Sequence, residues 1–110
     1  MRHEEYSTFI QGKIVGTAEA ILSCKMSIIV GSRKLNALRF ALDLDTDEDF
    51  GLFILIDSDT DHLPVDWERK NWSVEALAKK DVEIAECELF YKESVITACK
   101  KIIARFNVEP

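Results

Sequence analysis

The chain has 110 residues, of which 47% are hydrophobic and 31% charged, with only four Gly and two Pro. This length suits one domain, and the composition is that of a globular protein, which excludes a disordered or collagen-like chain. The formal charge of −6 argues against nucleic-acid binding, because a phosphate backbone is repelled by an acidic surface. We therefore expect a single domain over residues 1–110.

The sequence shows no membrane or disulfide signal. No apolar run approaches the about 20 residues that a membrane-spanning helix needs, and the first residues, MRHEEYS, lack the apolar core of a signal peptide. Cys24, Cys87 and Cys99 are an odd number without close C-x-x-C spacing, so neither a disulfide framework nor a zinc site is indicated. We expect a cytoplasmic protein with reduced thiols and no cofactor.

Two helices are predicted in the N-terminal part of the chain. Apolar residues recur at spacings of three and four over residues 5–24, and again over residues 27–43. Gly12 and Gly16 weaken the first pattern, because glycine is a poor helix former. Gly31, in the second pattern, marks either a break or a point where two elements pack closely.

A short strand is predicted at residues 50–57. The run FGLFILI is continuously apolar, rich in strand-forming residues and bounded by Asp on both sides. A lone strand leaves its hydrogen-bonding edges unpaired. Its partner would be a weak strand at residues 63–67, which would make a hairpin, or the same strand of a second copy, which would make a homodimer.

A long helix is predicted from Ser73 almost to the C terminus. Ser73 is a suitable N-cap, and Asp81 either caps or restarts the helix. Its core seam has spacings of three and four, interrupted by a lysine, and comprises Val82, Ala85, Leu89, Lys92, Ile96, Cys99, Ile103 and Phe106. The predicted fold class is therefore α+β, mostly α, with two N-terminal helices, one short β-strand or hairpin, and a long C-terminal helix.

Negative charge is concentrated between residues 40 and 68. This segment holds ten Asp and Glu and no Lys or Arg, whereas the rest of the chain holds ten acids and fourteen bases. Such a segment is either a solvated acidic loop or a surface that attracts a basic protein or a metal ion. The bases nearest to it in the sequence, which would pair with it inside the chain, are Arg33, Lys34, Arg39, Arg69 and Lys70.

The window of residues 57–68 carries acids at positions 1, 3, 5 and 12, as a calcium-binding EF-hand loop does. His62 stands where that loop requires Gly, Pro64 falls in its pairing segment, and the preceding element is predicted as strand where the motif requires helix. We therefore reject an EF-hand. A looser divalent-metal site at Asp57, Asp59, Asp61 and His62, in a small metal-dependent enzyme or metal-regulated domain, is the alternative function.

The preferred hypothesis is protein binding without catalysis. Trp67 lies within the acidic segment, and Trp72 follows it; aromatic side chains often anchor interfaces, and carboxylates beside them attract a cationic partner. No nucleophile accompanies His62, so no catalytic residue is assigned. The expected partner is a basic protein, and the predicted partner-binding residues are Asp57, Asp59, Asp61, His62, Asp66, Trp67 and Glu68.

Three segments of the chain resemble a family of small uncharacterised bacterial proteins. They are GSRKLNALRFAL at 31–42, FILIDSDTDHLP at 53–64, and R-x-x-W-S-x-E-A-L-A-x-K-D-x-E-I-A-E-x-E-x-F-Y at 69–91. This resemblance implies no activity and no functional residues. As a class, small acidic cytosolic domains without catalytic motifs also resemble the immunity proteins of bacterial toxin systems, which implies a basic nuclease-type toxin as the partner.

Overall fold

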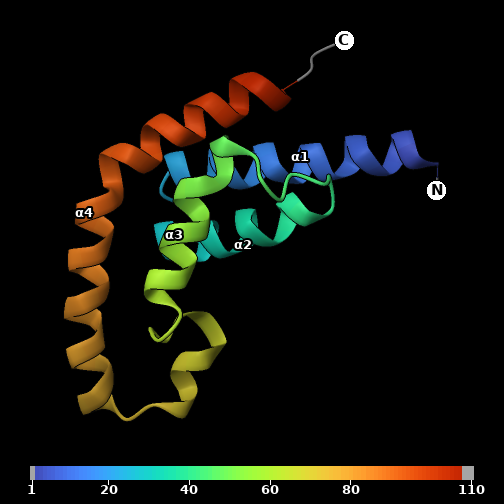
Figure 1. The fold of residues 1–110 in the computed structure, drawn as a ribbon. Helices are drawn as coiled ribbons and strands as arrows, with labels where there is room; N and C mark the ends of the chain where they lie inside the picture. The colour runs from blue at the N-terminus through green and yellow to red at the C-terminus, as the bar shows by residue number, and fades with distance from the viewer. Residues whose placement is uncertain (1, 108–110) are drawn as a thin grey trace.

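The computed structural model describes residues 2–107, and these residues form only helices and the turns between them. The elements in chain order are α1 (His3–Leu22), α2 (Ile28–Phe40), the 3₁₀ helix η1 (Glu48–Phe50), α3 (Gly51–Thr60), the 3₁₀ helix η2 (Asp66–Asn71) and α4 (Val74–Phe106). Helix α1 packs on α2 and on the second half of α4, and α2 packs on α3 (Figure 1).

The predicted strand at residues 50–57 is wrong, and so is the α+β class, because residues 2–107 contain no strand and this run forms η1 and α3. Phe50, Phe53 and Ile56 recur every three residues, so a helix turns all three to one face, where each is fully buried. A helix also satisfies its backbone groups internally, whereas a lone strand needs a partner. The homodimer predicted through strand pairing loses its basis.

The two predicted N-terminal helices are confirmed. Ser27 starts α2 as its N-cap, since its Oγ accepts a hydrogen bond from Val30 N at 3.1 Å. Gly31 is a close-packing point and not a break, because a Cβ at this position would overlap the side chain of Ile21 on α1. The absence of a side chain there lets α1 and α2 approach each other.

The predicted C-terminal helix is also confirmed, as one continuous helix of 33 residues. Ser73 caps it by accepting a hydrogen bond from Ala76 N at 3.1 Å, and the helix runs through Asp81 without restarting. The predicted core seam is wrong in the first half of α4, where Val82 and Leu89 are 59% and 76% exposed. The buried residues all lie later, at Tyr91, Val95, Cys99 and Ile102.

The first half of α4 extends away from α1 and α2 (Figure 1), whereas η2 stays in contact with α2 through Glu68 and Arg33. We call residues 66–90 the arm. The Cα radius of gyration is 15.0 Å, whereas a compact chain of this length would have about 13 Å. The arm thus makes the molecule elongated and places the first half of α4 beyond the helices that would otherwise cover it.

None of the helices within residues 2–107 combines the length and the apolar character that crossing a membrane requires.

Candidate functional site

Arg33, on α2, holds the acidic segment against the helices. Its guanidinium donates to the backbone oxygens of Thr60 at 2.7 Å and Leu63 at 3.1 Å. It also donates to Glu68 Oε1 at 3.0 Å, and its Nε lies 3.9 Å from Asp57 Oδ1. One cation therefore fixes the end of α3, the turn that follows and η2.

Asp57 and Glu68, two of the predicted partner-binding residues, thus already have partners inside the chain. Asp57 Oδ2 also accepts a hydrogen bond from Asn36 Nδ2 at 2.7 Å. Glu68 Oε1 accepts one from Val65 N at 3.3 Å, and this bond, together with the Arg33 guanidinium, lowers the pKa of Glu68. Both carboxylates serve to position the acidic segment.

Asp59 and His62, also predicted to bind a partner, connect the segment to α4. Asp59 Oδ2 accepts a hydrogen bond from Tyr91 Oη at 2.9 Å. Burial is the largest cause of the raised pKa of Tyr91, and this hydrogen bond to a carboxylate is the next largest. His62 contacts Glu83 through Nε2, and this contact lowers the pKa of Glu83. The first pair joins α3 to α4 just beyond the arm, and the second joins the turn after α3 to the arm itself.

Asp61, Asp66 and Trp67 are the predicted residues that stay exposed without such partners. Trp67 is 71% exposed. Neither aspartate forms an ion pair within the part of the chain that the structure describes. Asp66 has a φ of 50°, a left-handed conformation that Asp adopts more readily than most residues. These three residues are the part of the predicted surface that is open to a partner.

The aspartates of the proposed metal turn do not converge. Successive residues of a helix are about 100° apart, and the contacts diverge accordingly, since Asp57 reaches Arg33 on α2 whereas Asp59 reaches Tyr91 on α4. Across residues 2–107, no group of three or more His, Cys, Asp or Glu side chains is placed to hold a metal ion. No observation therefore favours the metal-dependent alternative.

The N-terminal part of the acidic segment pairs with the end of α4. Arg105 lies 2.6 Å from Asp47 Oδ2 and 2.7 Å from Asp49 Oδ2, and Lys101 lies 3.5 Å from Asp49 Oδ1. The hydrogen bond from Arg105 is the largest cause of the lowered pKa of Asp47. Intramolecular pairing of the acidic segment thus involves Arg33, as the sequence predicts, and also Lys101 and Arg105, which the sequence analysis did not single out.

A second exposed surface lies on α4, which the sequence pattern did not predict. We call it the outer face of α4 and define it by Val82, Glu86, Leu89, Phe90 and Glu93, which a helix places within an arc of roughly 100°. Val82, Leu89 and Phe90 are 59%, 76% and 79% exposed. The signal in the sequence is the opposite stripe of Ile84, Tyr91, Val95 and Ile102, which identifies the inner face.

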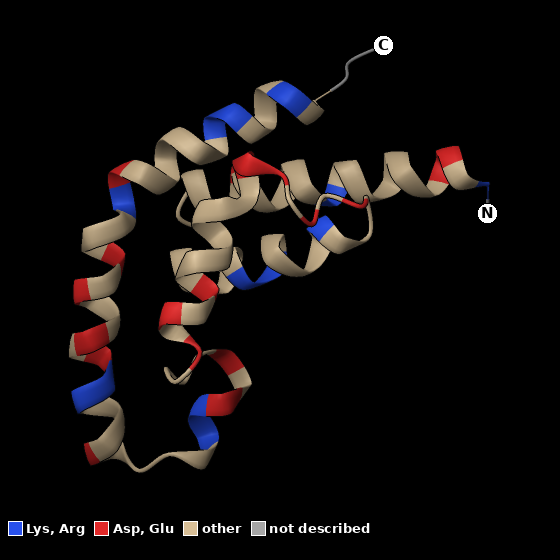
Figure 2. Ribbon diagram, viewed as in Figure 1, with Lys and Arg blue, Asp and Glu red and all other residues tan. Residues whose placement is uncertain are grey.

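The charge of α4 changes sign along its length (Figure 2). Residues 74–93 contain six acids and three bases, whereas residues 94–106 contain three bases and no acid. Within the described residues, Glu86 and Glu93 form no ion pair. The apolar side chains of the outer face are therefore accompanied by free negative charge.

These features define an all-α protein with a projecting acidic arm. Comparison with protein-family models, with curated proteins and with solved structures gives no match. The resemblance to small bacterial proteins accordingly stays a prediction.

Proposed function

We propose that the protein is a non-enzymatic binding module, and that the outer face of α4 binds a partner protein with a basic surface. The observation that carries this proposal is the juxtaposition of Val82, Leu89 and Phe90, all exposed, with the unpaired carboxylates of Glu86 and Glu93. Apolar anchors supply buried area in protein interfaces, and surrounding charges supply orientation and fast association.

The aromatic side chain of this face has one ring contact inside the chain. The Phe90 ring lies edge-on to the Tyr91 ring with 4.9 Å between centroids, and Tyr91 is itself bonded to Asp59. A contact that restricts a side chain before binding reduces the entropy that the side chain loses when a partner covers it. Single exposed apolar residues are common, whereas apolar residues grouped into one patch mark an interaction surface, and the outer face groups three of them on one side of α4.

The predicted surface at Trp67 is a second place where the same partner could bind. Trp67 lines a shallow depression with Val30 and Lys34 of α2, and Asp66 lies beside it. This depression is formed by η2 and α2, whereas the outer face belongs to α4 alone. Substitutions on one surface therefore leave the other intact, so the two can be tested separately.

A more specific form of this proposal, which we call the finer proposal, is that the protein is a cytoplasmic immunity protein that neutralises a basic, nuclease-type toxin. The net charge of −6 supports a cationic partner, and a toxin that binds nucleic acid must itself present a basic surface. In this function the carboxylates of the arm would occupy the positions where the toxin binds phosphates.

The test is capture of a partner by immobilised protein, followed by affinity measurement with the purified partner at two salt concentrations. We expect a basic partner. Its affinity should fall at least tenfold between about 0.1 M and about 1 M salt, because the Debye screening length shortens from about 10 Å to about 3 Å. Val82→Ser combined with Phe90→Ser should abolish binding, and Glu86→Gln combined with Glu93→Gln should weaken it.

The matched control is Glu4→Gln combined with Glu5→Gln, which removes the same charge from the exposed start of α1 and should leave binding unchanged. If only Trp67→Ala weakens binding, the surface predicted from the sequence is the contact and the outer face is not. An acidic partner, or an affinity insensitive to salt, contradicts the proposal. For the finer proposal, expression of the protein must restore growth to cells that produce the captured partner.

A further inference from the structure

A groove of about 410 Å³ lies between α1 and α2. We call it the basic groove and define it by six residues of its wall, which are Lys13, Gly16, Met26, Lys34, Ala37 and Leu38. The first two belong to α1, Met26 to the loop that follows, and the last three to α2. The wall contains two lysines and no acid, so it is opposite in charge to the outer face of α4.

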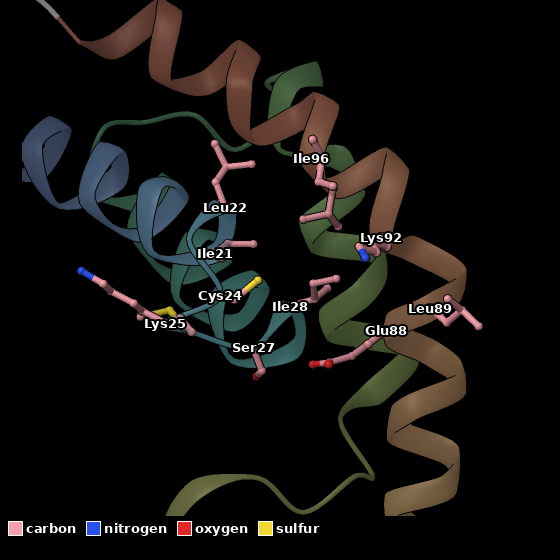
Figure 3. Close-up of a pocket in the computed structure, with 12 residues that line it drawn as sticks. Ile21, Leu22, Cys24, Lys25, Ser27, Ile28, Glu88, Leu89, Lys92 and Ile96 are labelled. Atoms are coloured by element: carbon pink, nitrogen blue, oxygen red, sulfur yellow. The ribbon is translucent and has the colours of Figure 1, made fainter.

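The two lysines of the basic groove are free to bind carboxylates. Neither forms an ion pair within residues 2–107, and both are exposed. Lys13 lies over the Phe9 ring, 5.1 Å from its centroid, a contact that orients the ammonium group without neutralising its charge. Lys25, next to Met26 in the sequence, extends away from α4 (Figure 3) and adds a third base on the α1–α2 side of the loop.

The floor of the basic groove is apolar and open. Met26 and Leu38 are half-buried, so each keeps some apolar surface that a partner would cover. A Cβ at Gly16 would meet nothing within 4 Å, so the backbone of α1 is open there to the side chains of an approaching helix. An apolar floor flanked by lysines suits a helix that carries apolar residues and acids on one face.

The outer face of α4 is such a helical face. Its apolar residues are exposed, and its two glutamates form no ion pair among the described residues. Leu89 projects from α4 away from α1, α2 and the loop between them (Figure 3). The outer face is therefore turned away from the basic groove of its own chain and is open to the groove of another copy.

We propose that the protein associates with itself head to tail, the outer face of α4 in one copy binding the basic groove of the next. The apolar side chains of the outer face cover Met26 and Leu38. Its two carboxylates pair with Lys13 and Lys34. Because two different surfaces meet, no two-fold axis relates the copies, and assembly can continue beyond two of them. This inference uses the same outer face as the proposed function but requires no foreign partner.

The net charge of −6 on each copy does not prevent this association. At physiological salt the Debye length is about 8 Å, so charges that lie farther apart are largely screened from one another. The charges that meet at the contact are opposite in sign, and they are the ones that act at short range. Local complementarity therefore outweighs the repulsion between whole molecules.

The experiment is sedimentation of the full chain at about 0.15 M salt, up to a protein concentration of about 1 mM, where weak association becomes visible. We expect the average mass to rise with concentration and to exceed twice the 12.6 kDa of one chain. The face variant combines Val82→Ser with Phe90→Ser, and the groove variant combines Lys13→Glu with Lys34→Glu. Each variant alone should stay monomeric.

Mixing the two variants tests whether the two surfaces bind each other. The groove variant keeps the outer face intact, and the face variant keeps the basic groove intact. An equimolar mixture should therefore form a one-to-one dimer and grow no further, because no second pair of matched surfaces remains. The groove variant should also still bind the partner of the proposed function, so failure of self-association and failure of that function are distinguishable.

The matched control combines Lys70→Glu with Lys100→Glu, two exposed lysines outside both surfaces. It carries the same charge change as the groove variant and should associate like the wild type. All substituted side chains are exposed, so unchanged melting temperatures should verify that the variants fold.

Four outcomes overturn the proposal. The first is a wild type that stays monomeric at the highest concentration. The second is a wild-type mass that stops at two copies, which would show one surface pairing with itself. The third is a control that is as monomeric as the groove variant, which would assign the loss to net charge. The fourth is a mixture of the face and groove variants that forms no dimer.

Discussion

At the scale of single residues, Arg33 joins α2 to the end of α3 and to η2 through two carbonyl oxygens and Glu68. We predict that Arg33→Ala lowers the free energy of unfolding by about 2 kcal/mol, because two partly buried carbonyls and two carboxylates lose their partner. Partial exposure of the guanidinium keeps the loss below that of a fully buried pair. Urea denaturation of the wild type and of Arg33→Ala measures this difference in the free energy of unfolding.

Lys34→Ala is the matched control, since Lys34 is the exposed neighbour of Arg33 on α2 and its loss should change stability by less than about 0.5 kcal/mol. Arg33→Lys should recover little, because an ammonium cannot reproduce the forked geometry of a guanidinium. Equal stability of Arg33→Ala and Lys34→Ala would show that the contacts of Arg33 do not hold the segment.

The role of Arg33 could be predicted only in part from the sequence. Its pairing with the acidic segment follows from the separation of charges along the chain, and this expectation is confirmed at Asp57 and Glu68. Its bonds to the carbonyls of Thr60 and Leu63 could not be predicted, because they require α3 to end against α2. Contacts between a side chain and a distant backbone leave no pattern in the sequence.

A second residue-scale prediction concerns Cys99, which is fully buried in the second half of α4. Burial raises the pKa of its thiol from 9.0 to about 11. The thiol of Cys99 therefore ionises at lower pH in the unfolded chain than in the folded protein. The protonated, buried thiol makes its full contribution to the free energy of unfolding below about pH 8.5, and this contribution is lost as the pH rises toward about 11.

When the pH is raised from about 8 to about 10.5, we expect the free energy of unfolding of the wild type to fall by roughly 1–2 kcal/mol more than that of the Cys99→Ala variant. The comparison matters because tyrosines and lysines also titrate in this range, and both proteins contain them. Urea denaturation at the two pH values gives the difference. Parallel losses in the two proteins would mean that the Cys99 thiol is as accessible in the folded protein as in the unfolded chain.

At the scale of elements, the crossing of α1 and α2 depends on Gly31. We predict that Gly31→Ala destabilises the protein by about 1–2 kcal/mol, because the new methyl group overlaps the buried side chain of Ile21 and outweighs the better helix propensity of Ala. Thermal denaturation measures the change.

Gly12→Ala is expected to have the opposite effect on stability. A Cβ at Gly12 meets nothing within 4 Å, so this change should stabilise the protein by about 0.5–1 kcal/mol through helix propensity alone. If Gly31→Ala were stabilising as well, Ile21 could move aside and the approach of α1 to α2 would not depend on Gly31.

The helices themselves were predictable and the apparent strand was not, for a physical reason. Residues 5–24 and 27–43 carry apolar spacings that only a helix turns to one face. The run at residues 50–56 is apolar throughout, so the helical face of Phe50, Phe53 and Ile56 is hidden among other apolar residues. Only the absence of a partner strand decides between the two structures, and that is a property of the whole fold.

The seam of α4 shows a related limit. A repeat of 3.5 residues and a helix of 3.6 residues per turn drift apart by about 20° per heptad. Over the residues from Val82 to Cys99 this drift amounts to only about 50°, which is too little to carry the seam from the outer face to the opposite inner face, and Cys99 is the first seam residue that is buried. The first half of α4 carries apolar residues on two faces, and the sequence does not show which face the rest of the chain covers.

At the scale of the whole molecule, the two halves of α4 differ in burial and in charge. The second half packs on α1 and supplies Lys101 and Arg105 to the acidic segment. The first half carries most of the acids of the helix and contributes none of its buried residues. The buried core residues of α4 and its exposed apolar residues are thus separated along one helix.

This separation predicts unequal hydrogen exchange along α4. Amides of residues 78–88 should exchange at least tenfold faster than those of residues 95–105, because opening the first half exposes little apolar surface whereas opening the second half disrupts the core. Uniform protection along the helix would show instead that α4 opens as one unit. A partner bound to the outer face should slow exchange in the first half alone, since the second half is already protected by the fold.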